Sequence, residues 1–365
     1  MSASFDELAD QPVPWLSGTG EHADIVLSSR TRLARNLSRH RYPVRAEPDE
    51  ARAVVELVKT VIKKSKLAKG GTFFDAADLG ENEREFLVER HLVSPEFVRD
   101  DTPRGLYIDD DESSSLMVNE EDHLRIQAVR SGLDIKTALE RARDIENELA
   151  SGLEFDCDAR LGYLTACPTN VGTGLRVSVM IHLPGLVLTK EMDSVLSQVN
   201  KFGVGVRGFY GEGSDVLGNL FQISNQTTLG RTEEDLVDSL EQVTRKLLTY
   251  EGHARRRLFT DAPNQIKDKL WRAYGILANA RVLSSQEVMN LLSAVRLGVA
   301  MGEPMGLDLA QVNELMLLAQ PAHIQRLFGK EMKPEERDVA RAELARKRLT
   351  RKRTRRRSGG DAAGK

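Results

Sequence analysis

The stretch LGYLTACPTNVGTGLRVSVMIHL, residues 161–183, predicts how the centre of this chain folds. Its second half alternates, with apolar residues at every second position from Leu175 to Leu183 and polar residues such as Arg176 and Ser178 between them. A period of two indicates a β-strand with one buried face. The glycines that precede this strand indicate a loop, so we expect a strand, a glycine-rich loop and a second strand in succession.

The rest of the chain divides into two parts of different character. Up to about Thr260, strand patterns alternate with amphipathic helices. Strands are expected at 25–33, 113–119, 204–209 and 220–224, with an alternating, extended run at 120–130, and helices at 47–67, 135–149, 190–202 and from Thr232. Beyond Thr260 only helical spacing appears, at 270–283, 287–299, 309–318 and 334–349. We therefore expect an N-terminal segment (1–21), a mixed helix–strand domain (22–259), an all-helical domain (260–345) and a basic tail (346–365).

The composition is that of an ordinary globular protein, since 40% of the 365 residues are hydrophobic and 29% are charged. No run of 18 apolar residues is present, and the first ten residues contain neither Lys nor Arg. Two cysteines, Cys157 and Cys167, are too few for a disulfide framework, and no Cys/His cluster has the spacing of a zinc site. These observations argue against a membrane or disulfide-rich protein, predict no protein-held metal, and favour a cytoplasmic enzyme.

The C-terminal part carries two charged features. Arg337 and Arg341 are i, i+4 neighbours with Asp338 beside them, a pattern that solvated helices also produce. Nine of the twelve residues from 346 to 357 are Lys or Arg, and because Asp361 and Lys365 cancel, the net charge of −3 becomes −12 for residues 1–345. Such a block indicates a disordered, solvated tail, with an acidic or nucleic-acid partner as the alternative.

Two charged segments lie near expected strands. Arg30 and Arg32 are two apart on one strand, so their guanidinium groups would project from one face and suit polyphosphate oxygens; a solvated strand face is the alternative. In the run NEEDHLR, which begins at Asn119, Glu121, His123 and Arg125 would share a face if the chain is extended. They could form a structural salt bridge or place a base beside a phosphate clamp.

Two glycine-rich segments could approach a ligand. The loop CPTNVGTGLR, residues 167–176, contains two glycines but lacks the Gly-Lys-Ser/Thr ending of a P-loop. The segment RGFYGEGS, residues 207–214, indicates either a mobile loop that carries Arg207 and Glu212 or a plain surface hairpin. Neither segment is specific alone.

Taken in order, these motifs resemble the guanidino-kinase (phosphagen kinase) family, which includes creatine and arginine kinases. The runs 119–125 and 161–176 match family signatures almost letter for letter, and the resemblance covers residues 22–255. It implies an α+β fold, with an antiparallel-sheet catalytic domain flanked by helices and followed by the all-helical domain. It also implies ATP with Mg²⁺, and five phosphate-binding arginines: Arg30, Arg32, Arg125, Arg176 and Arg207.

The remaining predicted site residues are assigned to the guanidinium substrate or to the nucleotide. A guanidinium is protonated at neutral pH, so a kinase for it needs carboxylates that grip the cation and accept a proton. We expect Glu121 and Glu212 in that role, with Glu121 as general base because a strand end holds it better than a glycine loop. The resemblance places Cys167 at the substrate as an accessory group, with a small buried residue as the alternative, and adds Ser28 and His91 at the nucleotide.

Two departures from the metabolite kinases point to one branch of the family. Only 27 residues precede Ser28, where those kinases carry a helical domain, and an all-helical extension follows Thr260. Both features, and the sequence 171–188, are similar to bacterial protein-arginine kinases of the McsB type. In these the motif at 337–342 belongs to a phosphoarginine-binding site.

The resemblance implies transfer of the γ-phosphoryl group of ATP to exposed arginines of proteins, marking them for regulation or degradation. Activation by phosphoarginine-containing proteins and an activating partner protein are expected with it. A homodimer is expected because catalytic cores with an appended apolar helical bundle often dimerise through the bundle. A free-guanidine kinase and an adaptor that only reads phosphoarginine are the alternatives. Nucleic acid is not expected as a partner, because aromatic residues make up 5% of the chain and offer no stacking platform.

Overall fold

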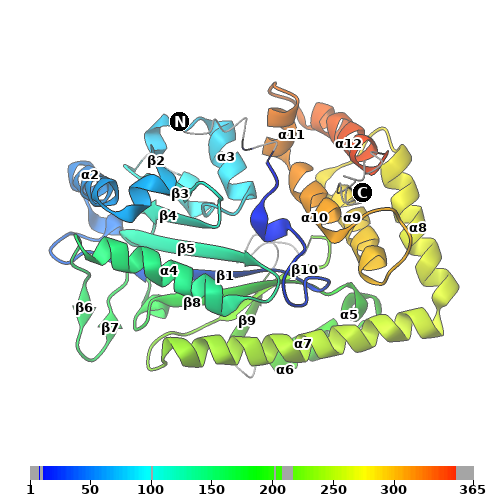
Figure 1. Ribbon diagram of the computed structural model, residues 1–365, viewed down its shortest axis with the longest axis horizontal. Helices are drawn as coiled ribbons and strands as arrows, with labels where there is room; N and C mark the ends of the chain where they lie inside the picture. The colour runs from blue at the N-terminus through cyan, green and yellow to red at the C-terminus, as the bar shows by residue number, and fades with distance from the viewer. Residues whose placement is uncertain (1–7, 9–10, 100–101, 201–202, 208–216, 351–365) are drawn as a thin grey trace, which may run out of the picture.

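A computed structural model describes residues 8, 11–99, 102–200, 203–207 and 217–350. Within them, an eight-stranded sheet has the order β2-β3-β4-β5-β1-β8-β10-β9, and every neighbouring pair is antiparallel (Figure 1). The strands are β1 (Val26–Arg35), β2 (Gly71–Asp75), β3 (Gly105–Asp109), β4 (Ser114–Val118), β5 (Leu124–Ser131), β8 (Leu175–His182), β9 (Val204–Arg207) and β10 (Leu220–Asn225). A separate hairpin pairs β6 (Cys157–Asp158) with β7 (Gly162–Tyr163). The expected α+β fold with an antiparallel sheet is confirmed.

The central strand, β1, gives the sheet its two faces. Its register places Leu33 opposite Ile126 of β5 and Leu175 of β8, so apolar side chains of three strands lie on one face. Helices α4 (Ile135–Ala150) and α7 (Glu233–Asp261) pack on this face and close the main hydrophobic core. The polar residues of the same strands therefore lie together on the opposite face.

Local sequence explains where the helices of this part begin. Helix α2 (Pro48–Lys64) has a proline in its first turn and a capping box between Glu47 and Glu50. Thr232 caps α7, as the sequence predicts, by accepting a hydrogen bond from the backbone N–H of Asp235. Caps of this kind stabilise a helix by about 0.5–2 kcal/mol.

Beyond α7 the described chain is helical. The helices are α8 (Pro263–Asn279), α9 (Ser285–Ala300), α10 (Leu309–Leu318), α11 (Pro321–Leu327) and α12 (Pro334–Thr350). Their apolar sides form a second core, which Val13, Trp15 and Leu16 of the N-terminal segment join. The 3-10 turn η1 (Pro14–Leu16) thus packs with the helices as well as with β1 and β5. None of the described helices is long and apolar enough to cross a bilayer.

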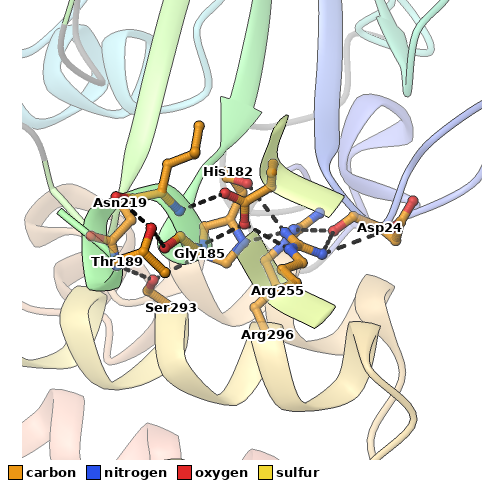
Figure 2. Close-up of polar contacts among 10 residues, drawn as sticks. Asp24, His182, Gly185, Thr189, Asn219, Arg255, Ser293 and Arg296 are labelled. Carbon is orange, nitrogen blue, oxygen red and sulfur yellow. Dashed lines mark hydrogen bonds and ion pairs between the residues drawn. The ribbon is translucent and has the colours of Figure 1, made fainter. Parts of the chain in front are cut away.

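A buried polar network joins the helices to the sheet (Figure 2). Arg296 of α9 is fully buried and donates to the carbonyls of Ala23 (2.8 Å) and Asp24 (2.9 Å) and to Nδ1 of His182 (3.0 Å) at the end of β8. Since Nδ1 accepts, Nε2 of His182 carries the proton and donates to Ser293 Oγ at 2.9 Å. These bonds hold α9 in one position against the sheet.

Three features of the sheet-containing part differ from the sequence-based expectation or were not expected from the sequence. The extended run expected from residue 120 begins only at Leu124, because Asn119 adopts a left-handed backbone (φ 59°) and the chain bends as far as His123. Strands β2 and β3 show no alternation of polar and apolar residues, so a period-two search passes over them. Helix α3 (Glu81–Glu89) is also not predicted, since most of its residues are charged or polar.

Candidate active site

The register of β1, β5 and β8 gathers arginines on the polar face of the sheet. Arg32 lies directly opposite Arg176 of β8, and Arg30 lies opposite Ser178. Arg125 of β5 lies opposite Ala34, which shares the face of Arg30 and Arg32 because alternate residues of a strand point the same way. Four of the five arginines predicted to bind phosphates therefore come together on adjacent strands.

This cluster is positively charged and only partly compensated. Arg30 donates to Gln222 Oε1 at 3.1 Å, and burial, together with Arg125 and Arg176, lowers its pKa to about 9. Burial, with the charges of Arg30, Arg125 and Arg176, holds the pKa of Arg32 well below its usual value. Among the residues that the structure describes, none is a hydrogen-bond partner for the buried Nε of Arg32. An anion bound here would relieve both the repulsion and the missing hydrogen bond, so the face suits a polyphosphate.

Among the described residues, Glu120 turns its carboxylate into this cluster, and no motif of the sequence singles it out. Its carboxylate accepts hydrogen bonds from Nη1 of Arg125 and from Oγ of Ser94. Burial raises the pKa of Glu120, but the bonds to Arg125 and Ser94 outweigh it, and the pKa is lowered overall. Nothing in the paired glutamates of the sequence tells which of them turns inward.

Glu121 lies at the rim of the cluster and stays exposed. Partial burial of its carboxyl raises its pKa, Asp122 and Glu120 add to the rise, and a side-chain hydrogen bond with Cys167 acts against it. Sγ of Cys167 also lies 3.0 Å from Oγ1 of Thr169. The structure therefore brings together Glu121 and Cys167, two predicted site residues 46 positions apart in the sequence.

The residues next to Glu121 hold the bend in place. Asp122 Oδ1 accepts from Nδ2 of Asn36 and from the backbone N–H of Ala166, both at 2.6 Å. His123 is buried, and its Nδ1 accepts from the backbone N–H of Leu37 at 3.1 Å. The shared face expected of Glu121 and His123 in an extended segment is therefore not formed, because the chain bends here and turns His123 into the protein.

A small pocket beside Arg30 contains the two other residues predicted at the nucleotide. Its lining includes Trp15, Ser28, Arg30 and His91. Burial, with a contribution from Arg30, lowers the pKa of His91 to about 3, so its ring is neutral at physiological pH. The rings of His91 and Trp15 meet edge to face with centroids 5.3 Å apart. Trp15 is the lining residue that motif matching overlooks, because it lies outside the matched segments.

Two predicted site residues are described incompletely or not at all. The backbone of Arg207 ends β9 opposite Gln222, which places this residue on the strand next to β10, at the edge of the arginine face. Glu212 lies outside the described residues. Among the residues that the structure describes, no group of three His, Cys, Asp or Glu side chains could hold a metal ion.

The second predicted site lies on α12. Arg341 is buried and donates to the carbonyls of Ala319 (2.7 Å) and Leu283 (2.8 Å), and it pairs with Asp338. Its guanidinium therefore fixes α12 against the segments that precede α9 and α11. Arg337 and Asp338 are half-buried and keep part of their side chains at the surface.

Comparison with known proteins identifies the family. Residues 53–254 match the model of the ATP:guanido phosphotransferase C-terminal catalytic domain, and residues 263–359 match that of the protein-arginine kinase McsB C-terminal domain. The chain belongs to the protein-arginine kinases of this family. It is 47% identical to the protein-arginine kinase of Symbiobacterium thermophilum (90% of this chain, 94% of the relative) and 45% identical to that of Geobacillus stearothermophilus (95% and 96%).

Solved structures of two guanidino kinases share the fold. A lombricine kinase superposes with a TM-score of 0.57 at 26% identity, over 69% of this chain and 71% of that one. The duplicated taurocyamine kinase of Schistosoma mansoni, solved with transition-state analogue components, gives a TM-score of 0.59 at 24% identity. That match covers 69% of this chain but 36% of the duplicated one.

Proposed function

We propose that this protein transfers the γ-phosphoryl group of ATP to arginine side chains of other proteins. The proposal rests on one observation: two surfaces of opposite charge lie next to each other. Glu121 with Cys167 forms an acidic rim that suits a guanidinium, and the arginine face beside it suits a triphosphate. Glu120, which contacts Arg125, directly precedes Glu121, so the two surfaces meet within two residues of chain.

On the nucleotide side, the chain supplies fixed positive charge. Arg30, Arg32, Arg125 and Arg176 would contact phosphate oxygens and stabilise charge as it develops on the transferring group, and we assign Arg207 to the same task. Mg²⁺ would add further charge neutralisation while coordinated mainly by phosphate oxygens and water. The neutral ring of His91, with Trp15 and Ser28, would hold the rest of the nucleotide.

On the substrate side, a proton must leave the guanidinium. We assign Glu121 as the base that accepts it while the nitrogen–phosphorus bond forms and the bond between the γ-phosphorus and the bridging oxygen of ADP breaks. Its raised pKa brings it closer to the working pH than an ordinary glutamate. Glu212 would grip the other side of the cation, and Cys167 would orient it.

The direct test is detection of acid-labile phosphate on a folded, arginine-containing protein after incubation with Mg-ATP. The wild type should form it and Glu121→Gln should not, with both proteins equally folded by circular dichroism. Free arginine serves as a parallel substrate. Faster turnover of free arginine than of the protein would favour a free-guanidine kinase, and absence of turnover on either would favour a phosphoarginine-reading adaptor.

We further propose that Arg337 and Asp338 bind phosphoarginine, with the phosphoryl group on the arginine and the guanidinium on the aspartate. Arg341, whose donors already bind backbone carbonyls, would support them from beneath. Calorimetry with free phosphoarginine should give binding to the wild type and none to the double variant Arg337→Ala, Asp338→Ala. Unchanged binding would contradict the assignment, and activation by the ligand can be read in the same preparations.

We also propose a cytoplasmic homodimer that forms through the helical part and responds to an activating partner protein. Large apolar side chains remain exposed there, among them Trp271, Ile276 and Val282. Exposed large apolar side chains are the residues through which such an interaction surface would form. Sedimentation of the wild type should give a dimer, and Trp271→Ser with Ile276→Ser should shift it to monomer.

A further inference from the structure

A groove with one basic side opens beside the acidic rim. One wall is the segment between β1 and α2, in which His40, Arg41, Tyr42, Val44 and Arg45 line the groove; we call these residues the basic wall. The opposite side is formed by Thr165 and Ala166, which follow the β6–β7 hairpin. The groove encloses about 670 Å³, within the range of about 300–1,000 Å³ that is common for ligand sites.

The basic wall is held in place from beneath. The backbone carbonyl of Arg41 lies 2.9 Å from Nε2 of His123, whose other ring nitrogen accepts from Leu37. The hydroxyl of Tyr42 donates to Asp156 Oδ2 at 2.5 Å. These contacts tie the wall both to the bend that carries Glu121 and to Asp156, the residue that precedes the β6–β7 hairpin. The wall is thus a preformed surface, which lowers the entropy cost of binding.

The groove leads to the place where the guanidinium is expected. Ala166 directly precedes Cys167, and its backbone N–H donates to Asp122, the neighbour of Glu121. A side chain that reaches the acidic rim would therefore leave its own main chain beside Thr165, Ala166 and the basic wall. A free amino acid has no such continuation, but an arginine within a polypeptide has one on both sides.

The chemistry of the groove favours one kind of continuation. Among the described residues that line it, none is acidic, and two are arginines. The side chain of Arg41 is 65% exposed, and its Nε lies 3.7 Å from Oε1 of Glu50. Arg45 is exposed, and Val44 between them is 70% exposed, so the wall offers charge with a central apolar contact.

We infer that this groove binds the polypeptide on either side of the target arginine and favours acidic residues there. The inference rests on the proposed function and adds the substrate class: arginines in acidic surroundings, selected by Arg41 and Arg45. One exposed ion pair changes an equilibrium by about 1.4- to 5-fold, so two pairs correspond to about 2- to 25-fold. The preference should shrink as added salt screens the charges.

The test compares two peptides that share one arginine and differ at the two positions on each side of it, which are Glu in one peptide and Gln in the other. The measured quantity is the ratio of their kcat/KM values. The wild type should prefer the Glu peptide by about 2- to 25-fold, and Arg41→Gln with Arg45→Gln should bring the ratio close to one. A matched control, Arg39→Asn with Lys63→Gln, removes two exposed charges outside the groove and should keep the wild-type ratio.

The inference would be overturned if the wild type gave a ratio of kcat/KM values near one. It would also be overturned if Arg41→Gln with Arg45→Gln kept the wild-type ratio, or if the control variant lowered the ratio as much as the groove variant does. Melting temperatures show whether the variants are folded. Fluorescence anisotropy with the same labelled peptides separates this inference from the proposed function. Selective binding of the Glu peptide that depends on Arg41 and Arg45, without phosphate transfer to it, would support the groove and contradict the kinase.

Discussion

Replacing Glu120 with glutamine should destabilise the nucleotide-free protein and leave nucleotide binding intact. Glu120 is buried and paired with Arg125, so the variant leaves that guanidinium beside Arg30, Arg32 and Arg176 without its carboxylate. Removing one partner of a buried ion pair costs about 3–5 kcal/mol. Because the side chain of Arg125 keeps 21% exposure, we expect the lower end, about 3 kcal/mol. At about 2–4 °C per kcal/mol, the melting temperature should fall by about 6–12 °C.

The assay is thermal denaturation of the wild type and Glu120→Gln with and without Mg-ATP. A bound triphosphate supplies the negative charge that the variant lacks, so the nucleotide should raise its melting temperature at least as much as that of the wild type. Glu148→Gln, which removes a carboxylate from a pair with the exposed Lys66, is the control and should cost under about 1 kcal/mol. The reasoning would be refuted if Glu120→Gln without nucleotide melted at the same temperature as Glu148→Gln. It would also be refuted if Glu120→Gln were folded but Mg-ATP no longer raised its melting temperature.

The pH dependence supplies a second check on Glu120. Its pKa is lowered in the folded protein, where the pair with Arg125 outweighs burial. A group with a depressed folded pKa contributes stability above its unfolded pKa and loses it as the pH falls through the folded value. The gap in stability between the wild type and Glu120→Gln should therefore be full near neutral pH and close below the ordinary range of glutamate. If the difference in stability persisted in acid, the lost stability of Glu120→Gln would come from altered packing and not from the lost charge.

Three further substitutions test other parts of the molecule. Glu121→Gln should lower turnover by about 10²–10⁴-fold, and because the pKa of Glu121 is raised, the acid limb of the wild-type pH–rate profile should lie above the ordinary glutamate range. Gly174→Ala should lower the free energy of unfolding by about 1–2 kcal/mol or more in denaturant, since φ of Gly174 is 61° and a Cβ would lie 2.6 Å from a backbone oxygen. The control Gly70→Ala should be near neutral, because no described atom lies within 4 Å of the Cβ it would add. Arg296→Met should leave His182 Nδ1 and the carbonyl of Ala23 without the donor that Arg296 supplies, at about 1–3 kcal/mol each, while the carbonyl of Asp24 keeps its hydrogen bond from Arg255. A urea midpoint equal to that of the wild type would contradict the role given to the network.

The predictability of the candidate site differs from residue to residue. Arg30 and Arg32 could be placed on one face because the side chains of a strand repeat every two residues. The position of Arg176 opposite Arg32 depends on the register between β1 and β8, which spacing along the chain does not give. The meeting of Glu121 with Cys167 follows from the family resemblance but not from any spacing along the chain. The inward turn of Glu120 depends on a left-handed backbone one residue earlier, which the sequence pattern does not reveal.

By itself the sequence determined the features that depend on residues two to four positions apart. These are the faces of β1 and β8, the capped starts of α2 and α7, and the helical character after Thr260. The tertiary structure alone decided what depends on contacts across the chain. It placed Trp15 beside His91, gave Arg296 its carbonyl partners from the turn before β1, and aligned the basic wall with Ala166. Such contacts form only when the sheet and helices pack, because their energy comes from burial and hydrogen bonds between residues that no local pattern links.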